Sequence, residues 1–301
     1  MEELQAQPVQ LEKRVSLIPV TVVIAARNEE RNLARCLEAL RNMAEVYVID
    51  SQSTDATPEI ARAHGAQVVQ FHYQGGWPKK RQWAMDTLPL ASDWILLLDA
   101  DEVVAPELAE EIRHAIMNPD VDGYFLQLRM HFLGRTLKHG ETGLWKLSLF
   151  RKGIGHYECR LQEQDASMGD MEVHEHVVVD GRTARLKNPL IHHNVNSLYR
   201  YIQKHNEYSN WEARVYLQGE KGSSELPPRF LGTQAQRRRW LKRWLQAVPG
   251  APALAFFYRY ICRLGFLDGV PGLIYCGLQA VQMFHSKAKI YELKLEARDR
   301  S

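Results

Sequence analysis

The chain has 301 residues, of which 45% are hydrophobic and 25% are charged. This is the composition of an ordinary globular protein, and the length allows one large α/β domain with an appendage or two domains. The formal net charge of +2 points to no particular class of partner by itself.

The cysteines are widely spaced and include no Cys-x-x-Cys pair: they are Cys36, Cys159, Cys262 and Cys276. The sequence therefore predicts neither a disulfide framework nor a zinc ribbon, and it fits a reducing cytosol. Residues 1–19 are expected to form an N-terminal extension. Its first 14 residues are polar and lack the apolar core of a signal peptide.

The first hundred residues alternate between short apolar runs and helical patterns. The run at 20–26 is rich in β-branched residues, which predicts a buried first strand. Further strands are expected at 46–49, 67–70 and 94–98, and helices at 33–40, from Thr57 and from Lys79. Strands that alternate with helices in this way imply a mostly parallel sheet with right-handed crossovers.

Three of these strands end in polar loops, at residues 27–30, 50–55 and 99–102. In a parallel sheet the loops meet at the carboxyl edge, where open α/β sheets bind ligands. Asp99 and Asp101 can converge there on one Mg²⁺ or Mn²⁺ ion, because both ions favour oxygen ligands. The alternative is a strand followed by an acidic helix start.

The same edge offers the groups that a nucleotide needs. Asp50 and Asp99 could accept hydrogen bonds from a base and a ribose, and the run Lys79-Lys80-Arg81 could neutralise phosphate. The alternatives are that Asp50 caps its own loop and that the basic run is a solvated helix start. The first turn has no Gly-x-Gly-x-x-Gly sequence, which counts against a dinucleotide site.

Three motifs, at residues 22–30, 48–57 and 97–102, closely resemble those of the family-two inverting glycosyltransferases with a GT-A fold. The resemblance implies an α/β fold of the GT-A type, which is a Rossmann-like, mostly parallel sheet flanked by helices. It further implies that Asp50 pairs with the uracil of a UDP-sugar donor, that Asp99 lies near the ribose, and that Asp101 binds Mg²⁺ or Mn²⁺.

The donor site implied by the resemblance is a larger set of residues: Ala25, Arg27, Glu29, Asp50, Lys80, Arg81, Asp99 and Ala100. Two positions depart from the family pattern. Gln82 stands where the family often has Asn, and Ser51 stands where many members have a second Asp. These departures concern the base and phosphate contacts, not the fold.

A candidate general base follows in the sequence Glu172-Val173-His174-Glu175-His176. An inverting transfer needs one carboxylate to take the proton of the acceptor hydroxyl. Glu175 resembles the glutamate of the His-Glu pair in the lipopolysaccharide-core and polysaccharide branch of the family, so it is the first candidate and Glu172 the second. A zinc site built on His174 and His176, as in zinc hydrolases, and a solvated strand edge are the alternatives.

Between these motifs, a helix is predicted at 106–116 and strands at 122–130 and 145–151. Residues 131–170 are expected to help shape the acceptor site.

A later apolar stretch ends in His192 and His193. GT-A enzymes commonly place a late histidine on the metal of the acidic pair, so the resemblance makes His192 a metal ligand beside Asp101. His193 is the second candidate, and a surface or core histidine is the alternative.

The tail differs from the rest of the chain, because residues 226–267 contain eight basic residues and no acidic one. Trp240, Leu241 and Trp244 fall on one helical face, as in a helix that lies in an anionic membrane interface. The apolar face favours lipid over nucleic acid, so no nucleic-acid partner is expected. Residues 269–286 carry no charge but are short and interrupted, which favours an in-plane or re-entrant helical pair over a span.

These features predict a catalytic domain at 20–218, with a nucleotide-binding half at 20–102 and an acceptor half at 103–218, and a helical, membrane-associating region at 226–301. The predicted reaction is an inverting, metal-dependent transfer of a hexose from a UDP-sugar to a lipid-linked, lipopolysaccharide or polysaccharide acceptor. The expected location is cytoplasmic, at the inner face of the cell membrane. The alternatives are a nucleotidyltransferase that makes the sugar nucleotide and a non-catalytic, membrane-bound binding module.

Overall fold

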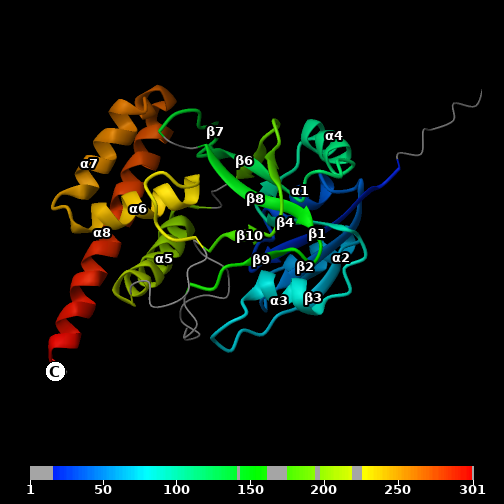
Figure 1. Cartoon of the computed structure of the whole chain (residues 1–301), viewed down its shortest axis with the longest axis horizontal. Coiled ribbons are helices and arrows are strands. Elements are labelled where there is room, and N and C mark those ends of the chain that lie inside the picture. Colours follow the sequence, from blue (N-terminus) through cyan, green and yellow to red (C-terminus); the bar gives the residue numbers. More distant parts are fainter. Residues whose placement is uncertain (1–15, 141–142, 161–174, 194–196, 219–225, 300–301) are drawn as a thin grey trace, which may run out of the picture.

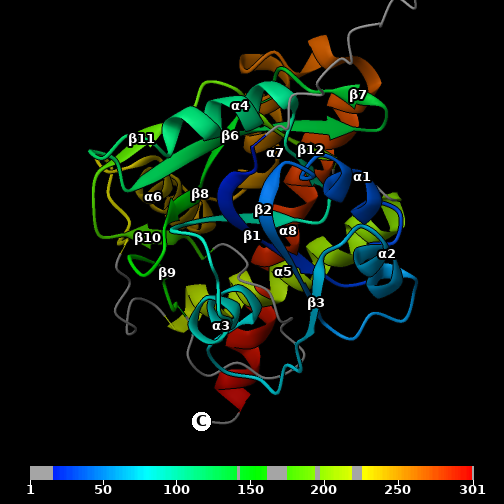
Figure 2. The same cartoon turned by 90° about the vertical axis from the view of Figure 1, so that its right-hand side faces the viewer.

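The computed structural model describes residues 16–140, 143–160, 175–193, 197–218 and 226–299. One large sheet occupies the first two thirds of the chain, and the helices of the C-terminal third are grouped beside it (Figure 1). After a quarter turn, the last turns of α8 are seen to extend beyond the sheet (Figure 2).

The strands are β1 (Ile18–Ala26), β2 (Met43–Asp50), β3 (Gln67–Gln70), β4 (Trp94–Asp99), β5 (Glu102–Val103), β6 (Gly123–Phe132), β7 (Arg135–Thr136), β8 (Leu144–Arg151), β9 (Gly155–Tyr157), β10 (Val177–Val179), β11 (Thr183–Arg185) and β12 (Leu190–His193). The helices are α1 (Leu33–Glu38), α2 (Thr57–Ala63), α3 (Lys80–Thr87), α4 (Pro106–Ala115), α5 (Leu198–Gln218), α6 (Gln234–Ala247), α7 (Ala251–Phe257) and α8 (Gly269–Asp299), with a π-helical turn η3 (Tyr258–Cys262) and a 3-10 helix η4 (Gly265–Asp268) between the last two.

The main sheet has the order β3-β2-β1-β4-β8-β6-β12-β5, with β7 and β11 paired to β6, and β9 and β10 form a separate two-stranded sheet. The four strands β3, β2, β1 and β4 are parallel, as the sequence predicts. The sheet is mixed beyond them, because β8 runs antiparallel to both β4 and β6. The short connections from β6 through β7 to β8 allow only antiparallel pairing.

Alternate side chains of the parallel strands enter two separate cores. Val22 and Ile24 of β1 lie in the core that α1 and α4 cover, whereas Val23 lies in the core under α3. Burial on both faces explains why these strands are continuous apolar runs in the sequence. In the resulting register Ala26 lies opposite Asp50, and Ala25 lies opposite Asp99, so the polar ends of three strands are neighbours.

The C-terminal helices pack on the β6–β7 hairpin through aromatic contacts. The ring of Phe132 lies edge-on to those of Tyr201 and Tyr275, with centroid distances of 5.6 and 5.5 Å. Within the described residues, no single helix is both long and apolar enough to cross a membrane. The segments Ala251–Cys262 and Gly265–Asp299 reach that length and composition only together, and they are bent by 71° where they meet.

The buried carboxylate of Asp268 fastens this bend to the loop after β7. Asp268 is 2% exposed and accepts hydrogen bonds from the backbone N–H groups of Lys138 and His139, at 3.1 and 2.9 Å. The N–H of Gly140 donates to the carbonyl of Arg263 at 2.9 Å. The bend between α7 and α8 is therefore held to the sheet by specific polar contacts as well as by apolar packing.

Replacing Asp268 with alanine is expected to lower the free energy of unfolding by about 1–3 kcal/mol, because the backbone N–H groups of Lys138 and His139 lose their buried acceptor. Urea unfolding followed by circular dichroism measures this loss. The control is Asp299→Ala, an exposed acid at the far end of α8, which should cost no more than about 0.5 kcal/mol. Equal losses for the two variants would contradict the role given to Asp268.

Candidate functional site

Asp99, Asp101 and His192 lie together at the carboxyl edge of the sheet. Asp99 ends β4, Asp101 lies in the turn to β5, and His192 comes from β12, which pairs with β5. One possible ligand atom from each of the three residues lies within 4.8 Å of the other two. In particular, Nδ1 of His192 is 3.6 Å from Oδ1 of Asp101.

Two atoms of this group, Oδ1 of Asp101 and Nδ1 of His192, are buried and have no hydrogen-bond partner among the described residues. Burying polar atoms without a partner costs free energy. A divalent cation between them would satisfy both atoms, since carboxylate oxygen is a preferred ligand of Mg²⁺ and Mn²⁺ and imidazole nitrogen also binds transition metals. The residues present therefore fit the metal that the sequence predicts.

The two neighbouring histidines have different surroundings, because consecutive residues of a strand face opposite sides. Although burial lowers the pKa of His192, the carboxylates of Asp101 and Glu102 raise it to about 9. Burial, followed by the charge of Arg35, lowers the pKa of His193 to about 4. The ring of His193 packs on that of His131, with centroids 4.9 Å apart. The geometry therefore favours His192, not His193, as the metal ligand.

Asp99 is surrounded by cations that come from two other elements. The guanidinium of Arg81 on α3 donates to Oδ1 of Asp99, and Nζ of Lys146 on β8 lies 3.4 Å from Oδ2. Burial opposes ionisation of Asp99, but these two charges hold its pKa well below the usual range. The N–H of Asp99 donates to Glu102 at 2.8 Å, and Glu102 also accepts from Lys146. Glu102 thus fixes the turn that carries Asp101.

Sequence reasoning missed two lysines of this site, Lys146 on β8 and Lys204 on α5. The pKa of Lys204 is raised by Tyr208 and, against the effect of burial, by Asp101 and Asp99. The charge of Lys204 therefore acts on the candidate metal ligands. In the sequence, Lys146 stands inside a mostly apolar strand, but no pattern indicates that α5 approaches this edge.

The loops after β1 and β2 are held together by side-chain caps that the motifs did not reveal. Asn28 adopts a left-handed conformation, with φ 55°. Its N–H donates to Oγ of Ser53 and its Oδ1 accepts from the N–H of Thr54, both at 2.8 Å. The N–H of Glu29 donates to Oγ1 of Thr57 at 2.8 Å. The polar residues of both motifs therefore serve first to join the two loops.

Asp50 lies at the base of these loops, fully buried, and it caps its own loop. Its Oδ2 accepts from the N–H of Ser53 at 3.1 Å and from Nε2 of Gln70 at 2.8 Å, and its Oδ1 accepts from Oγ of Ser53. The alternative interpretation, in which Asp50 caps its own loop, is therefore observed. A carboxylate has further lone pairs, so the pairing of Asp50 with uracil stays a prediction.

The other predicted donor residues line the same edge at different depths. Ala25 and Ala100 are buried in the strand ends, with exposures of 3% and 2%, whereas the side chain of Arg27 is exposed. Burial, followed by the charge of Asp101, raises the pKa of Glu29, which adds a further carboxylate near the candidate metal ligands.

The basic run at the start of α3 is not a solvated helix start, because Lys79, Lys80 and Arg81 are all buried. Nζ of Lys80 donates to the carbonyl of Ala26 at 3.0 Å, at the end of β1. Arg81 reaches Asp99, as described above. The three cations therefore point to three different parts of the site, and phosphate binding by Lys80 and Arg81 stays a prediction.

Glu175 is also buried, with 5% exposure, so the solvated strand edge is wrong for this residue. Its Oε2 lies 3.4 Å from Nζ of Lys79, and both side chains are inaccessible to solvent. The other candidate base, Glu172, and the histidine His174 lie outside the described residues. Within the described part of the chain, the one group of residues that could hold a metal does not include His176, so nothing there supports the zinc-hydrolase alternative.

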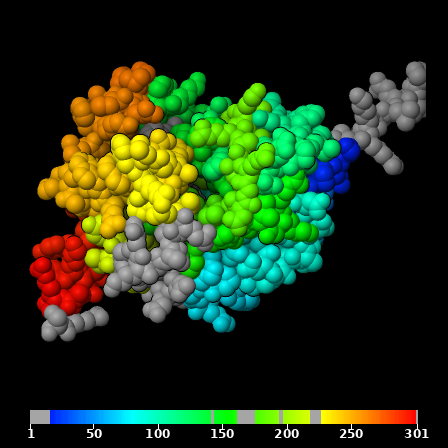
Figure 3. Space-filling view, viewed as in Figure 1, coloured from blue at the N-terminus to red at the C-terminus, as the bar shows by residue number. Residues whose placement is uncertain are grey.

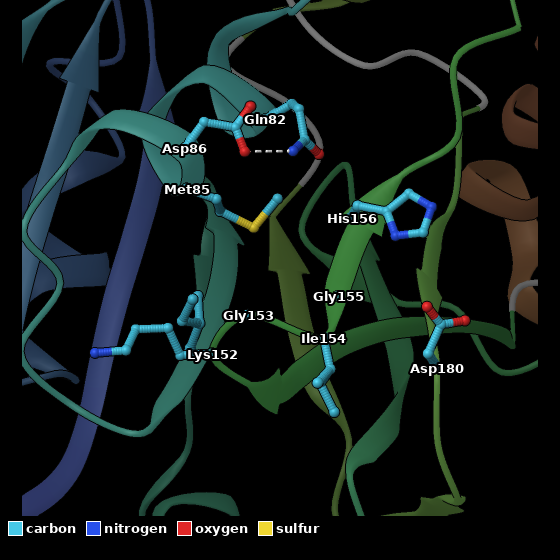
Figure 4. Close-up of a pocket in the computed structure, with 10 residues that line it drawn as sticks. Gln82, Met85, Asp86, Lys152, Gly153, Ile154, Gly155, His156 and Asp180 are labelled. Atoms are coloured by element: carbon cyan, nitrogen blue, oxygen red, sulfur yellow. Dashed lines mark hydrogen bonds between the residues drawn. The ribbon is translucent and has the colours of Figure 1, made fainter.

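A separate hollow of about 250 Å³ lies between α3 and the β8–β9 turn (Figure 4). Gln82, Asp86, His156 and Asp180 are among its lining residues, and Nε2 of Gln82 donates to Asp86 at 2.8 Å. None of the predicted site residues lines it. Ile95, which does, is four residues before Asp99 on β4, so the hollow lies roughly 13 Å along the strand from the metal ligands.

Comparisons with known proteins agree with the motifs. Residues 21–178 of this chain match the sequence model of the family described as Glycosyl transferase family 2. The chain is 25% identical to the lipopolysaccharide core biosynthesis glycosyltransferase LpsC of Rhizobium meliloti (strain 1021), over 90% of this chain and 94% of that protein. It is 26% identical to an uncharacterized glycosyltransferase of Rickettsia typhi (strain ATCC VR-144 / Wilmington), over 93% and 89%. The solved structure of S. aureus TarS 1-349 in complex with UDP-GlcNAc gives a TM-score of 0.44 and 16% identity, over 92% of each chain.

The contrast between the two histidines yields a paired prediction. His192→Ala should weaken Mn²⁺ binding by at least about tenfold, because it removes a ligand atom that faces Asp101. His193→Ala, at the adjacent position, should leave Mn²⁺ binding within about twofold of the wild type, since its ring packs on His131. Electron paramagnetic resonance of free Mn²⁺ measures both affinities. A larger loss in the His193 variant than in the His192 variant would refute the assignment.

Proposed function

The chain belongs to glycosyl transferase family 2, and on that premise we propose that it transfers a hexose, with inversion and with the help of a divalent metal, from a UDP-sugar to a lipid-linked, lipopolysaccharide or polysaccharide acceptor. The family match supports a glycosyltransferase over a nucleotidyltransferase and over a non-catalytic binding module. The lipopolysaccharide-core relative, which is similar over nearly its whole length, supports the class of acceptor.

This proposal rests on Oδ1 of Asp101 and Nδ1 of His192, which are buried 3.6 Å apart and have no hydrogen-bond partner among the described residues. These two residues would hold Mg²⁺ or Mn²⁺, with Asp99 next to them. The bound cation would stabilise the negative charge of the diphosphate as it leaves. Lys204, whose charge lies beside Asp101 and Asp99, is suited to add positive charge at the same place.

The proposed donor site uses the strand ends that the fold brings together. Asp50 would accept from the uracil and Asp99 would lie at the ribose, as the family resemblance implies. Arg81 and Lys146 hold the carboxylate of Asp99 in place, so the donor would meet a group that needs little reorganisation.

Glu175 is the proposed general base. The acceptor oxygen attacks the anomeric carbon, the bond from that carbon to the diphosphate oxygen breaks with its electron pair going to the diphosphate, and Glu175 takes the hydroxyl proton. Two contacts at the start of α3 support the assignment of Glu175 as the base and of Asp99 as a donor-site residue. Lys79 contacts Glu175 and Arg81 contacts Asp99, so one helical turn links the candidate base to the candidate donor site.

The acceptor would be reached at a membrane surface, and the exposure of α6 supports this part of the proposal. Trp240, Leu241 and Trp244 are 39%, 43% and 54% exposed, and the yellow atoms of α6 lie at the surface in Figure 3. On the opposite face, Arg239 and Lys242 bond to Glu158 and Glu212. The helix therefore exposes its tryptophans together with Arg237 and Arg243, and this combination suits an anionic membrane interface.

The bend between α7 and α8 adds to the same surface. Leu254, Phe257 and Val270 are 55%, 57% and 68% exposed. Arg237 on α6 and Arg263 at the bend are also exposed. Apolar side chains interspersed with arginines fit an anionic lipid surface. The proposed location is therefore the cytoplasmic face of the cell membrane.

Glu175→Gln is expected to lower transfer by about 10²–10⁴-fold, because the amide cannot take the hydroxyl proton. The affinity for UDP-glucose with Mn²⁺ should not change. Transfer of radiolabelled hexose from a panel of UDP-sugars to extracted lipopolysaccharide core measures the loss, and nuclear magnetic resonance of the product gives the anomeric configuration. A chelator should stop transfer by the wild type, and Mn²⁺ should restore it. Full transfer in the presence of chelator, or by the variant, would refute the mechanism.

The double variant Trp240→Ser/Trp244→Ser should bind vesicles rich in phosphatidylglycerol at least about tenfold more weakly, since two large apolar side chains are lost from the contact. Flotation of the full chain with vesicles measures binding. The control is Met117→Ser, which removes a 76% exposed apolar side chain near the end of α4. Binding that is equal for the double variant and the control, or that is insensitive to salt, would argue against the proposed membrane surface.

A further inference from the structure

A group of buried charges lies between the sheet and the C-terminal helices, and the proposed chemistry uses only one of its members. This group, which we call the charge seam, consists of Lys79, Glu158, Arg160, Glu175 and Arg239. Lys79 caps the start of α3, Glu158 and Arg160 follow β9, Glu175 precedes β10, and Arg239 belongs to α6. Buried charges persist only where they are paired, so the contacts within the seam decide where Glu175 can lie.

The strongest contact of the seam joins Arg239 to Glu158. Glu158 is 1% exposed, and the side chain of Arg239 is 9% exposed. Nη1 of Arg239 donates to Oε2 of Glu158 at 2.8 Å, and Nη2 donates to Oε1. Nη1 also donates to the carbonyl of Leu226 at 2.6 Å. Two parallel bonds between a guanidinium and a carboxylate fix both distance and orientation.

Glu158 in turn holds the backbone next to the candidate base. The N–H of His176 donates to Oε1 of Glu158 at 2.9 Å, and the N–H of Glu158 donates to the carbonyl of His176 at 3.1 Å. His176 follows Glu175 directly in the chain, and β10 begins one residue later. The position of Glu175 therefore depends on where Glu158 is held.

The far side of the seam is formed by α5. The indole of Trp211, 2% exposed, has Cζ of Arg160 at 5.3 Å and Nζ of Lys79 at 5.9 Å from its ring centre. Burial, followed by the charge of Arg239, lowers the pKa of Arg160 to about 10. The seam is thus closed by an aromatic side chain on one side and by Arg239 on the other.

We propose that Arg239 is a positioning residue for glycosyl transfer: from α6 it holds Glu158, and through Glu158 and the backbone of His176 it sets the place of Glu175 beside Lys79. This inference rests on the proposed role of Glu175 as the base. It gives α6 a second role beside its proposed contact with the membrane. The outward face of the helix would meet lipid while its inward face holds the base. A movement of α6 would therefore affect both the membrane contact and the position of Glu175.

The chain offers a matched control for a merely structural role. Lys242, one turn along α6 from Arg239, bonds to Glu212 of α5, whose side chain is 5% exposed. Glu212 also accepts from Oγ of Ser286 on α8 at 2.6 Å. Lys242 is thus connected through Glu212 to α5 and α8, whereas Arg239 is connected through Glu158 to His176. Loss of Lys242 should therefore remove one contact between α6 and α5 while leaving the bonds between Arg239 and Glu158 in place.

The test compares Arg239→Met, Arg239→Lys and Lys242→Met in the full chain, with acceptor in detergent so that vesicle binding is not required. Arg239→Met should lower kcat at least about tenfold, since a displacement of a catalytic group by about 1 Å is costly. The Kd for UDP-glucose with Mn²⁺ should not change. Arg239→Lys should recover part of kcat, because an ammonium can make one of the two contacts. Lys242→Met should keep kcat within about twofold.

Combining Arg239→Met with Glu175→Gln shows whether Arg239 acts by positioning Glu175 or in some other way. In that background Arg239→Met should cause no further loss, because two residues that act through one step are not additive. An additive loss, or equal kcat for Arg239→Met and Lys242→Met, would overturn the inference while leaving the proposed function intact. Wild-type transfer by Glu175→Gln alone would overturn both. If Arg239→Met does not fold, the kcat of Arg239→Lys and its combination with Glu175→Gln decide the question.

Discussion

The crowding of carboxylates at one buried edge of the sheet is the constraint on which the rest of the structure depends. Asp99, Asp101 and Glu102 lie within four consecutive positions, and the charges of Asp101 and Asp99 also act on Glu29. Such a group is stable only if cations surround it. They are supplied from three elements far apart in sequence: Arg81 from α3, Lys146 from β8 and Lys204 from α5. One pair of atoms, on Asp101 and His192, is left for a metal.

This requirement explains why the mixed part of the sheet follows the parallel part. The strand β8 enters beside β4 and brings Lys146 to Asp99, and β12 returns beside β5 and brings His192 to Asp101. The parallel strands supply the acids, and the later strands supply the groups that balance them. The C-terminal helices complete the arrangement, because α5 contributes Lys204 and α6 holds Glu158 through Arg239.

Much of the fold could be predicted from the sequence, because strands buried on both faces leave continuous apolar runs such as 94–98. The proximity of Asp101 and His192 was also predictable, since it follows from the strand ends and from the family resemblance. What could not be predicted are contacts between distant elements. Nothing local shows that Lys79 is buried beside Glu175, or that Arg239 reaches Glu158, because tertiary packing decides both contacts.

The site works as proposed only if Asp101 and His192 hold a metal that the donor requires. This requirement is tested most directly by calorimetric titration of UDP into the wild type and into Asp101→Ala, each with Mn²⁺ and with a chelator. We expect the wild type to bind UDP with Mn²⁺ and to lose most of this affinity with the chelator. The variant should remain folded and bind UDP weakly in both conditions. Equal affinity in all four titrations would contradict the requirement for a metal.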